Sequence, residues 1–169
     1  YDGSYRNDVW ALSLAGTPAW AALSPTGALP RARSSHSAIY DPVRDRMVVH
    51  GGYTIEGYPC GPTMNDVWAL SLAGTPTWSE LTPTGTPADP RREHTAIYDP
   101  VRDRMVVFGG YVCPGGWRRD VWALSLAGTP AWTALTPTGT PPSARSEHSA
   151  IYDPVRDRMV VFGGSPYLN

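Results

Sequence analysis

Three histidines recur at matching places in the sequence and raise the question of a metal site. His36, His94 and His148 each precede the same strand-like stretch, and a ring of imidazoles around a channel could hold a metal ion. No second potential ligand stands beside any of them at helical or hairpin spacing, as a zinc site needs. We therefore expect these histidines to make structural hydrogen bonds, and we expect no metal and no cofactor.

An arginine lies three positions before each of these histidines, at Arg33, Arg91 and Arg145. The planar guanidinium group suits recognition of carboxylates or phosphates. One interpretation places the three arginines in a ligand site, and the other pairs them with carboxylates of a neighbouring repeat, such as Asp41. The sequence leaves both interpretations open.

Several classes of function find no support in the sequence. There is no Gly-x-Ser-x-Gly stretch, no glycine-rich phosphate loop with lysine, and no His-Glu-x-x-His, so we expect no catalytic residues and no enzyme. The formal net charge of −1 argues against a broad nucleic-acid surface. No apolar run approaches the roughly 20 residues that span a bilayer.

The residues above are carried by an internal repeat. The stretch DVWALSLAGTP occurs identically at 8–18, 66–76 and 120–130, and AIYDPVRDRMVV occurs at 38–49, 96–107 and 150–161. Each aspartate of the first stretch lies at the same distance from the histidine that follows it. A period of about 55 residues is typical of a propeller rather than a solenoid.

Each repeat reads as four short strands in two hairpins. In the third repeat, 148–152 and 158–162 flank an Asp-Pro turn, and 120–126 and 132–136 flank Ala-Gly-Thr-Pro. We expect the charged Asp-Pro-Val-Arg-Asp-Arg segment to be a plain, solvated hairpin turn. Such small sheets must pack on neighbours, which favours an all-β ring of blades.

The order of motifs resembles the kelch repeat over essentially the whole chain. It comprises Arg-x-x-His, an apolar strand ending in Gly-Gly, Asp-Val-Trp, and a lone Trp about ten residues later. The resemblance implies a β-propeller of four-stranded blades, with the histidine strand innermost and the late tryptophan strand outermost. We expect one propeller segment over 1–169, with 1–24 as the outer half of a split blade, 33–82 and 91–136 as blades, and 145–164 as the inner half.

Three blades are fewer than the roughly 4 to 8 that close a propeller. We therefore expect two chains to pair head to tail as a homodimer, forming a six-bladed ring in which each chain completes the other's split blade. The alternative is that these residues belong to a longer kelch array.

Residues shared by all repeats are best explained as architecture. We expect the repeated tryptophans to pack between sheets, and the second glycine of each Gly-Gly pair to allow a close approach that a side chain forbids. The tryptophans are Trp10, Trp20, Trp68, Trp78, Trp122 and Trp132, and the glycines are Gly52, Gly110 and Gly164.

Differences between the repeats concentrate in the stretches after Gly-Gly, at 53–65, 111–119 and the pair 165–169 with 1–7. Counting strand reversals puts these loops on the same face as the Arg-x-x-His loops, and we call this end of the sheets the loop face. Aromatic and arginine side chains on loops over a rigid scaffold are typical of a recognition surface. The candidate ligand-binding residues there are Tyr5, Arg6, Tyr53, Tyr58, Tyr111, Trp117, Arg118, Arg119 and Tyr167, with Arg33, Arg91 and Arg145 beside them.

The two cysteines, Cys60 and Cys113, stand in loops of successive repeats on this face. A disulfide between them is plausible and suits an exported protein, so we expect an extracellular or cell-surface location.

Two kinds of function fit these expectations. The first is a non-catalytic module that binds a protein, peptide or glycan on the loop face. The second is a structural or designed self-assembling scaffold, or a fragment of a longer array. Galactose oxidase uses a kelch-type propeller with copper, but its cross-linked Cys and Tyr copper site has no counterpart that we can match here.

Overall fold

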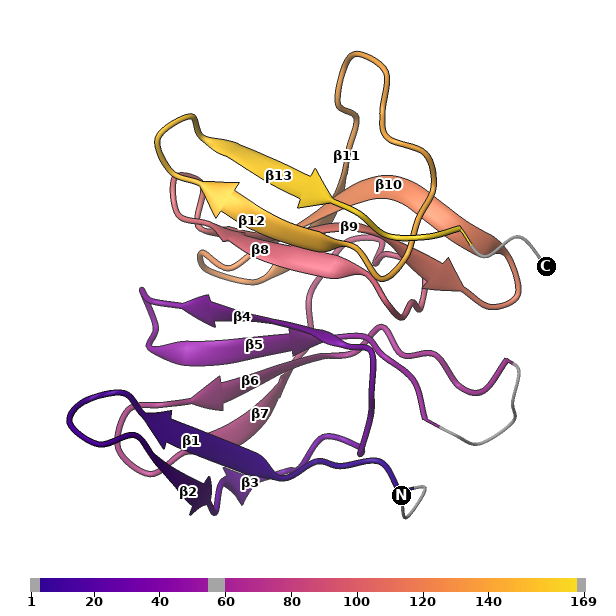
Figure 1. Ribbon diagram of the computed structural model, residues 1–169. Coiled ribbons are helices and arrows are strands. Elements are labelled where there is room, and N and C mark those ends of the chain that lie inside the picture. Colours follow the sequence, from indigo (N-terminus) through magenta and orange to yellow (C-terminus); the bar gives the residue numbers. More distant parts are fainter. Residues whose placement is uncertain (1–3, 55–59, 167–169) are drawn as a thin grey trace.

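The computed structural model describes residues 4–54 and 60–166 of the 169-residue chain (Figure 1). All regular elements in these two ranges are β-strands. The expectation of an all-β chain is therefore confirmed. No helix in the described residues is long and apolar enough to cross a membrane.

The first full sheet is an antiparallel run of β4 (Ser37–Asp41), β5 (Arg46–His50), β6 (Val67–Ser71) and β7 (Thr77–Leu81). The short β3 (Thr26–Gly27) adds to β7 in parallel at the outer edge. Apolar side chains dominate β5 and β6, which explains why these two strands occupy the middle of the sheet.

The second full sheet has the same order, with β8 (Thr95–Asp99), β9 (Arg104–Val112), β10 (Gly116–Ser125) and β11 (Ala131–Leu135). Its pairing register repeats that of the first sheet. For example, Val106 lies opposite Ala123 as Val48 lies opposite Ala69.

Two hairpins remain on either side of the full sheets. The N-terminal hairpin contains β1 (Val9–Ser13) and β2 (Ala19–Leu23), and the C-terminal hairpin contains β12 (Ser149–Asp153) and β13 (Arg158–Phe162). By register, the first matches the outer strand pair of a full sheet and the second matches the inner pair.

The sheets are stacked in chain order. The inner strands lie next to each other, with β4 beside β8 and β8 beside β12 (Figure 1). The histidine-bearing ends of the repeats therefore converge on one side of the molecule.

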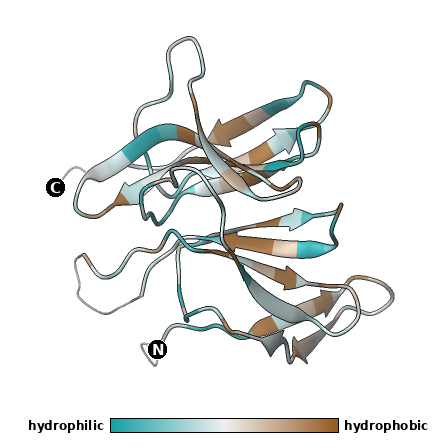
Figure 2. Ribbon diagram, turned by 180° about the vertical axis from the view of Figure 1, so that it is seen from behind, coloured by the Kyte–Doolittle hydropathy of each residue, from teal (hydrophilic) through white to brown (hydrophobic). Residues whose placement is uncertain are grey.

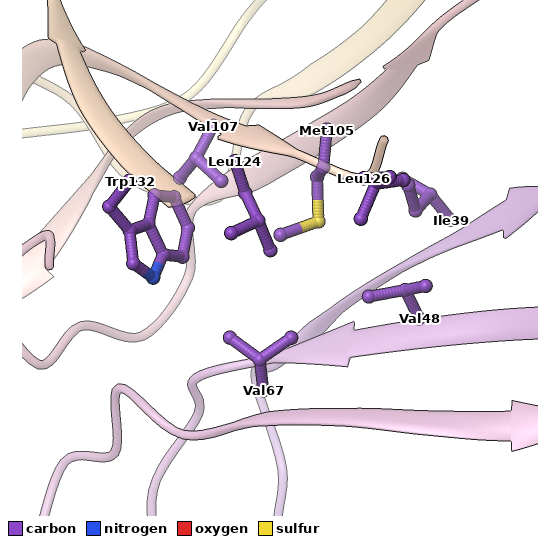
Figure 3. Packing of buried hydrophobic residues seen from close by; sticks show 8 residues of the cluster. All are labelled: Ile39, Val48, Val67, Met105, Val107, Leu124, Leu126 and Trp132. Atoms are coloured by element: carbon purple, nitrogen blue, oxygen red, sulfur yellow. The ribbon is translucent and has the colours of Figure 1, made fainter. Parts of the chain in front are cut away.

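The main core lies between the two full sheets (Figure 3). The first sheet contributes aliphatic side chains, and the second contributes a larger set that includes a tryptophan. The eight buried residues are Ile39, Val48, Val67, Met105, Val107, Leu124, Leu126 and Trp132. Figure 2 shows that the apolar segments of both full sheets lie in their strands, whereas the connecting turns are mostly polar.

The tryptophans do not all share one environment. Trp68, Trp78 and Trp132 are buried and Trp122 packs at the edge of the main core, as expected. Trp10 and Trp20 of the N-terminal hairpin are 54% and 66% exposed, so the expectation of packing between sheets is wrong for them in this chain. The reason is that the described residues place no further sheet against the outward side of that hairpin.

Gly110 shows why the second residue of each Gly-Gly pair is glycine. Its φ is 95°, and a Cβ there would lie 2.7 Å from the carbonyl oxygen of Arg92. A side chain would thus be strained by its own backbone and would collide with the loop that precedes β8.

The turn between β4 and β5 is the hairpin turn we expected, with Pro42, Val43 and Asp45 exposed, but its charged side chains make ion pairs. Asp41 is fully buried and accepts hydrogen bonds from Arg44 and Arg46, and the same arrangement surrounds Asp99. Arg44 also reaches Asp103 in the next sheet, with 2.6 Å between nitrogen and oxygen. The sequence did not reveal these ion pairs, because the guanidinium group bridges two turns that lie close only once the sheets stack.

Candidate functional site

The loop face is built by short backbone bridges between two kinds of loop. Ser34 pairs with Tyr53 and Arg92 pairs with Tyr111, so each Arg-x-x-His loop is fastened to the stretch that follows Gly-Gly in the same repeat. These bridges hold the candidate residues against the rigid ends of the sheets.

Aromatic and arginine side chains form a continuous row across this face. The rings of Tyr5 and Tyr53 meet edge to face with centroids 5.6 Å apart. The guanidinium carbon of Arg92 lies 4.5 Å from the Tyr53 centroid and 5.0 Å from the Tyr111 centroid. Tyr111 in turn meets Trp117 at 5.5 Å. These five side chains are the aromatic–arginine row.

Arg92 joins the two halves of the row, and sequence reasoning missed it. A cation between two aromatic faces is attracted by both rings, and Arg92 also lies 3.4 Å from the Glu93 carboxylate. The signal was available, because the other repeats carry Ser34 and Ser146 at this position.

The stretch 111–119 is largely a strand extension and not the loop we expected. β9 and β10 continue past the sheet, and Trp117 lies opposite Tyr111 across this extension. The register shifts between Arg118 and Val121, as in a β-bulge. The extension fixes both rings on paired backbone, which makes this part of the row rigid.

A disulfide joins the two stretches that differ most between repeats. Cys60 and Cys113 are bonded, with their Cα atoms 5.4 Å apart. The bond ties the connection between β5 and β6 of the first full sheet to the extended hairpin of the second, so the loop face is covalently linked across the sheet boundary.

The arginines of the Arg-x-x-His loops do not face a ligand site. Arg91 is fully buried, donates two hydrogen bonds to Asp120 at 2.8 Å and a third to the Gly109 carbonyl. Arg33 does the same with Asp66 and Gly51. Their placement in a ligand site was wrong, and the aspartate that pairs with each is that of Asp-Val-Trp, not the Asp41 type.

Arg145 occupies the equivalent position in the third repeat without an equivalent partner there. It donates to the Gly163 carbonyl at 2.8 Å and to Ser143. In the described part of the chain no Asp-Val-Trp strand stands next to β13.

The remaining candidates lie around the row rather than in it. Arg118 contacts the Gly115 carbonyl and Asp89, and Arg119 is exposed at the outer side of β10. Arg6 is exposed, and its carbonyl accepts a hydrogen bond from the Arg33 amide. Tyr58 and Tyr167 lie outside the described residues.

Two of the histidines bridge neighbouring sheets. His94 Nε2 lies 2.8 Å from the Ser37 hydroxyl, and His148 Nε2 lies 2.8 Å from the Thr95 hydroxyl. Burial lowers the pKa of each of them, and the nearby arginines add to that shift. They are therefore neutral hydrogen-bonding groups at neutral pH. In the described ranges no group of three His, Cys, Asp or Glu side chains is placed to hold a metal ion.

His50 is a further histidine that sequence reasoning passed over. Burial lowers its pKa to about 4, although the Asp66 carbonyl is 3.3 Å from its Nδ1 and opposes that effect. Its ring packs between His94 and Trp132, at 5.2 and 4.9 Å. The other repeats carry Phe108 and Phe162 here, which was the available signal.

The charges nearest the loop face are mostly neutralised by ion pairs. Burial works to raise the pKa of Asp66, but the hydrogen bonds from Arg33 and Trp68 outweigh it and hold the pKa below its usual range. Asp120 is held low in the same way beside Arg91. What the face offers a ligand is therefore mainly ring surface, with the Arg92 guanidinium group between two rings and paired with Glu93, on a scaffold braced by ion pairs.

Comparison with known proteins gives matches over nearly the whole chain. Residues 1–166 match the family model described as the KLHDC2/KLHL20/DRC7 Kelch-repeats domain. Multiple epidermal growth factor-like domains protein 8 of Rattus norvegicus is 31% identical over 156 residues, which cover 92% of this chain and 5% of that protein. Host cell factor 2 of Homo sapiens is 34% identical over 115 residues, which cover 64% of this chain and 13% of that protein. The chain thus spans a small part of the curated relatives it matches.

A solved structure has a similar fold. The structure of YjhT superposes with a TM-score of 0.65 over 85% of this chain and 48% of that chain, at 11% sequence identity. At this identity the likeness concerns the fold alone.

Proposed function

Because the chain belongs to the Kelch-repeat family, we propose that it is a non-catalytic binding module whose loop face holds a protein or peptide partner. Members of this family are generally protein-interaction modules. The remainder of the large relatives lies outside the matched segment, so the proposal concerns the segment itself.

The aromatic–arginine row is the observation that supports this proposal. It crosses the boundary between the two full sheets. Its central residue, Arg92, differs from Ser34 and Ser146 at the same position of the other repeats, whereas Tyr53 and Tyr111 share one position that is Ser165 in the third repeat. Residues that differ among otherwise identical repeats are not required by the shared scaffold. Aromatic and arginine side chains also supply most of the binding energy at protein interfaces.

The composition of the row suits an extended peptide with acidic groups. Ring edges and faces offer apolar contact area, and the Arg92 guanidinium group between Tyr53 and Tyr111 can exchange its contact with Glu93 for an acidic group of the ligand. The same rings could stack on sugars, so a glycan is the second ligand class that the experiment must distinguish.

In this proposal two copies form a six-bladed ring that presents the row twice on one face. The disulfide between Cys60 and Cys113 favours an oxidising, extracellular setting. A purely structural scaffold remains the alternative, and it requires no ligand on the row.

The test is a parallel screen of the chain against a displayed peptide library and a glycan array. Ligands retained by the unmodified chain are then tested on Arg92→Ala and Trp117→Ala, which remove the centre and one end of the row. We expect each change to weaken binding at least about tenfold, a hot-spot effect. Val101→Ala is the matched control, because Val101 is exposed in the turn at the opposite end of the second sheet.

The outcomes separate the alternatives. Peptide ligands lost by both row variants and kept by Val101→Ala support the proposal, and glycans with the same behaviour would shift it to the second class. Ligands that both row variants retain would place the site elsewhere. No retained ligand on either matrix would favour a scaffold.

A further inference from the structure

Neighbouring sheets are joined by a charge contact that always runs in the same direction along the chain. Arg44 in the first full sheet reaches Asp103 in the second at 2.6 Å, and Arg102 in the second reaches Asp157 in the C-terminal hairpin at 2.8 Å. Each repeat therefore gives an arginine to the repeat that follows it.

A second contact between the inner strands has the same direction. The Ser37 hydroxyl meets His94 of the next sheet, and the Thr95 hydroxyl meets His148 of the sheet after that. Each repeat gives a hydroxyl to the histidine of the repeat that follows.

Both contacts leave complementary halves at the two sides of the stack. In the C-terminal hairpin, Arg156 and Ser149 correspond to Arg44 and Ser37 but have no following sheet to contact. In the first full sheet, Asp45 and His36 correspond to Asp103 and His94 but have no preceding inner hairpin to contact. In the described ranges none of the four has a hydrogen-bond or ion-pair partner in a neighbouring sheet.

A third contact lies within each full sheet, and in the two hairpins the two residues that would form it are left apart. Arg33 pairs with Asp66 and Arg91 with Asp120, each joining an inner hairpin to an outer hairpin. Arg145 of the C-terminal hairpin and Asp8 of the N-terminal hairpin stand at the same positions and are far apart in the sequence. The Asp8 carboxylate accepts a hydrogen bond from Trp10, as Asp66 does from Trp68.

The two hairpins also expose the side chains that a full sheet buries. Trp132 packs against His50 across the main core, whereas its counterpart Trp20 is exposed. Phe108 packs against His148 of the next repeat, whereas its counterpart Phe162 is 82% exposed.

Two pockets lie where these exposed rings would fit if the pattern continued. One lies on the side of the second full sheet that faces away from the first full sheet, and it is lined by Phe108, Val121, Leu135 and Pro137. The other lies between the N-terminal hairpin and the first full sheet and is lined by Asp8, Val9, His36, Met47, Val49 and Trp78. The second pocket thus contains two of the unmatched halves, Asp8 and His36.

The strand edges are complementary in register as well. In the first full sheet β5 pairs with β6 so that His50 lies opposite Val67 and Val48 lies opposite Ala69. The corresponding strands here are β13 and β1, and in the described residues each pairs on one side only. Repeat equivalence sets Phe162 opposite Val9 and Val160 opposite Ala11.

We infer that a second copy of this chain docks on these edges, so that β13 of one copy pairs antiparallel with β1 of the other. At each seam Arg145 of one copy forms an ion pair with Asp8 of the second copy. Trp20 of one copy enters the pocket beside Phe108, and Phe162 of the other copy enters the pocket beside His36.

A second copy is the occupant because every unmatched half has its counterpart in this same chain. The charges are complementary, the strand register is that of the full sheets, and both pockets are filled by residues at equivalent repeat positions. Two copies give six four-stranded sheets, within the roughly 4 to 8 that close a propeller. The two seams are related by a two-fold axis, so the assembly closes. It does not depend on what the loop face binds.

The first experiment measures the native mass of the chain and of two charge-reversal variants by light scattering. We expect the unmodified chain at twice its 18.3 kDa. Arg145→Glu alone and Asp8→Arg alone each set like charges against each other at both seams, so each variant's dissociation constant rises at least about tenfold. An equimolar mixture of the two variants has one reversed and one natural ion pair, and the dimer returns.

Matched variants separate assembly from folding. Trp20→Glu removes a seam side chain and should give a single-chain mass with an unchanged β-sheet circular dichroism spectrum. Val101→Glu puts the same charge on an equally solvent-exposed residue away from the seams and should stay dimeric. A single-chain mass for the unmodified protein, or a mixture that fails to restore the dimer, would overturn the inference.

Cross-linking tests the register directly. A chain carrying Ala11→Cys mixed with one carrying Val160→Cys should form a covalent dimer under oxidation, because the two positions lie opposite each other as Ala69 and Val48 do. Val161→Cys replaces Val160→Cys as the control, since neighbouring side chains in a strand point to opposite faces. Equal cross-linking by both would exclude this register.

Discussion

Trp132 and Trp20 occupy the same position in two copies of one repeat, yet Trp132 is 5% exposed and Trp20 is 66% exposed. Their local structures are alike. Leu124 lies opposite Trp132 in the second full sheet, and Leu12 lies opposite Trp20 in the N-terminal hairpin. The difference comes from the neighbouring sheet, which one has and the other lacks.

This comparison shows that the local sequence determines the formation and register of each hairpin, whereas packing against a neighbouring sheet determines which side chains are buried. An isolated two-stranded hairpin is marginal in water, and burial of one face against a neighbour supplies its stability. The same substitution should therefore have different effects in the full sheets and in the hairpins. Two measurements use that difference and a third concerns His50 in the first full sheet, in order of decreasing expected effect.

Leu124→Ala should destabilise the chain by about 4 kcal/mol, because it empties a fully buried site in the main core. Leu12→Ala removes the same atoms from a side chain that is 39% exposed in the single chain. Its cost should stay below about 1 kcal/mol at dilutions where the chain is monomeric. Denaturant titration of both variants gives the comparison, and equal costs would mean that Leu12 is already buried in the monomer.

Arg91→Ala should cost about 3 kcal/mol, at the low end for a broken buried ion pair because Asp120 keeps some contact with water. Arg145→Ala removes contacts to Gly163 and Ser143 only, and should lower the denaturation midpoint mainly where the protein is assembled. The dependence of each midpoint on protein concentration distinguishes the two effects. A midpoint for Arg145→Ala that falls equally at all concentrations would contradict the seam contact.

His50 should make stability fall with acid between about pH 6.5 and pH 4. Burial lowers its pKa to about 4 in the folded chain, so the unfolded chain binds the extra proton in this window and is favoured as the pH falls. The loss attributable to His50 is about 2 kcal/mol between pH 7 and 4.5.

His50→Phe installs the residue found at 108 and 162, and it should reduce this slope. The slope does not vanish, because burial also lowers the pKa values of His36, His94 and His148. Thermal unfolding at several pH values measures it. An unchanged slope would mean that His50 does not carry the effect.

The fold could be predicted from the sequence because the strand and turn motifs recur in nearly identical repeats. The alternation of apolar residues with Asp-Pro and Gly-Gly turns predicted strands that agree closely with β12, β13 and β11. The same reasoning failed at 111–119, where pairing across the extension overrides loop-like composition. A single stretch of sequence does not reveal that Tyr111 and Trp117 face each other.

The site was less accessible because its contacts cross repeat boundaries. Arg92 acts through rings in two other segments, and Arg44 acts through an aspartate in the next sheet. Neither partner lies near its arginine in the sequence. Arg33 and Arg91 were misplaced although Asp66 and Asp120 lie in the same full sheet, because the sequence does not show that strand pairing brings these residues together.

The identical register of the outer hairpins has a consequence for how the chain reaches this arrangement. Val9 lies opposite Leu23, Val67 opposite Leu81 and Val121 opposite Leu135. The strands that pair with the inner hairpins also share the sequence VWALS, so these strands do not distinguish one repeat from another. A nascent inner hairpin can therefore recognise the wrong outer hairpin as readily as the right one, and order must come from the short connections after Gly-Gly. The variable loops then determine which inner hairpin pairs with which outer hairpin during folding. Exchanging these loops between repeats should raise the fraction of mispaired, aggregating chains.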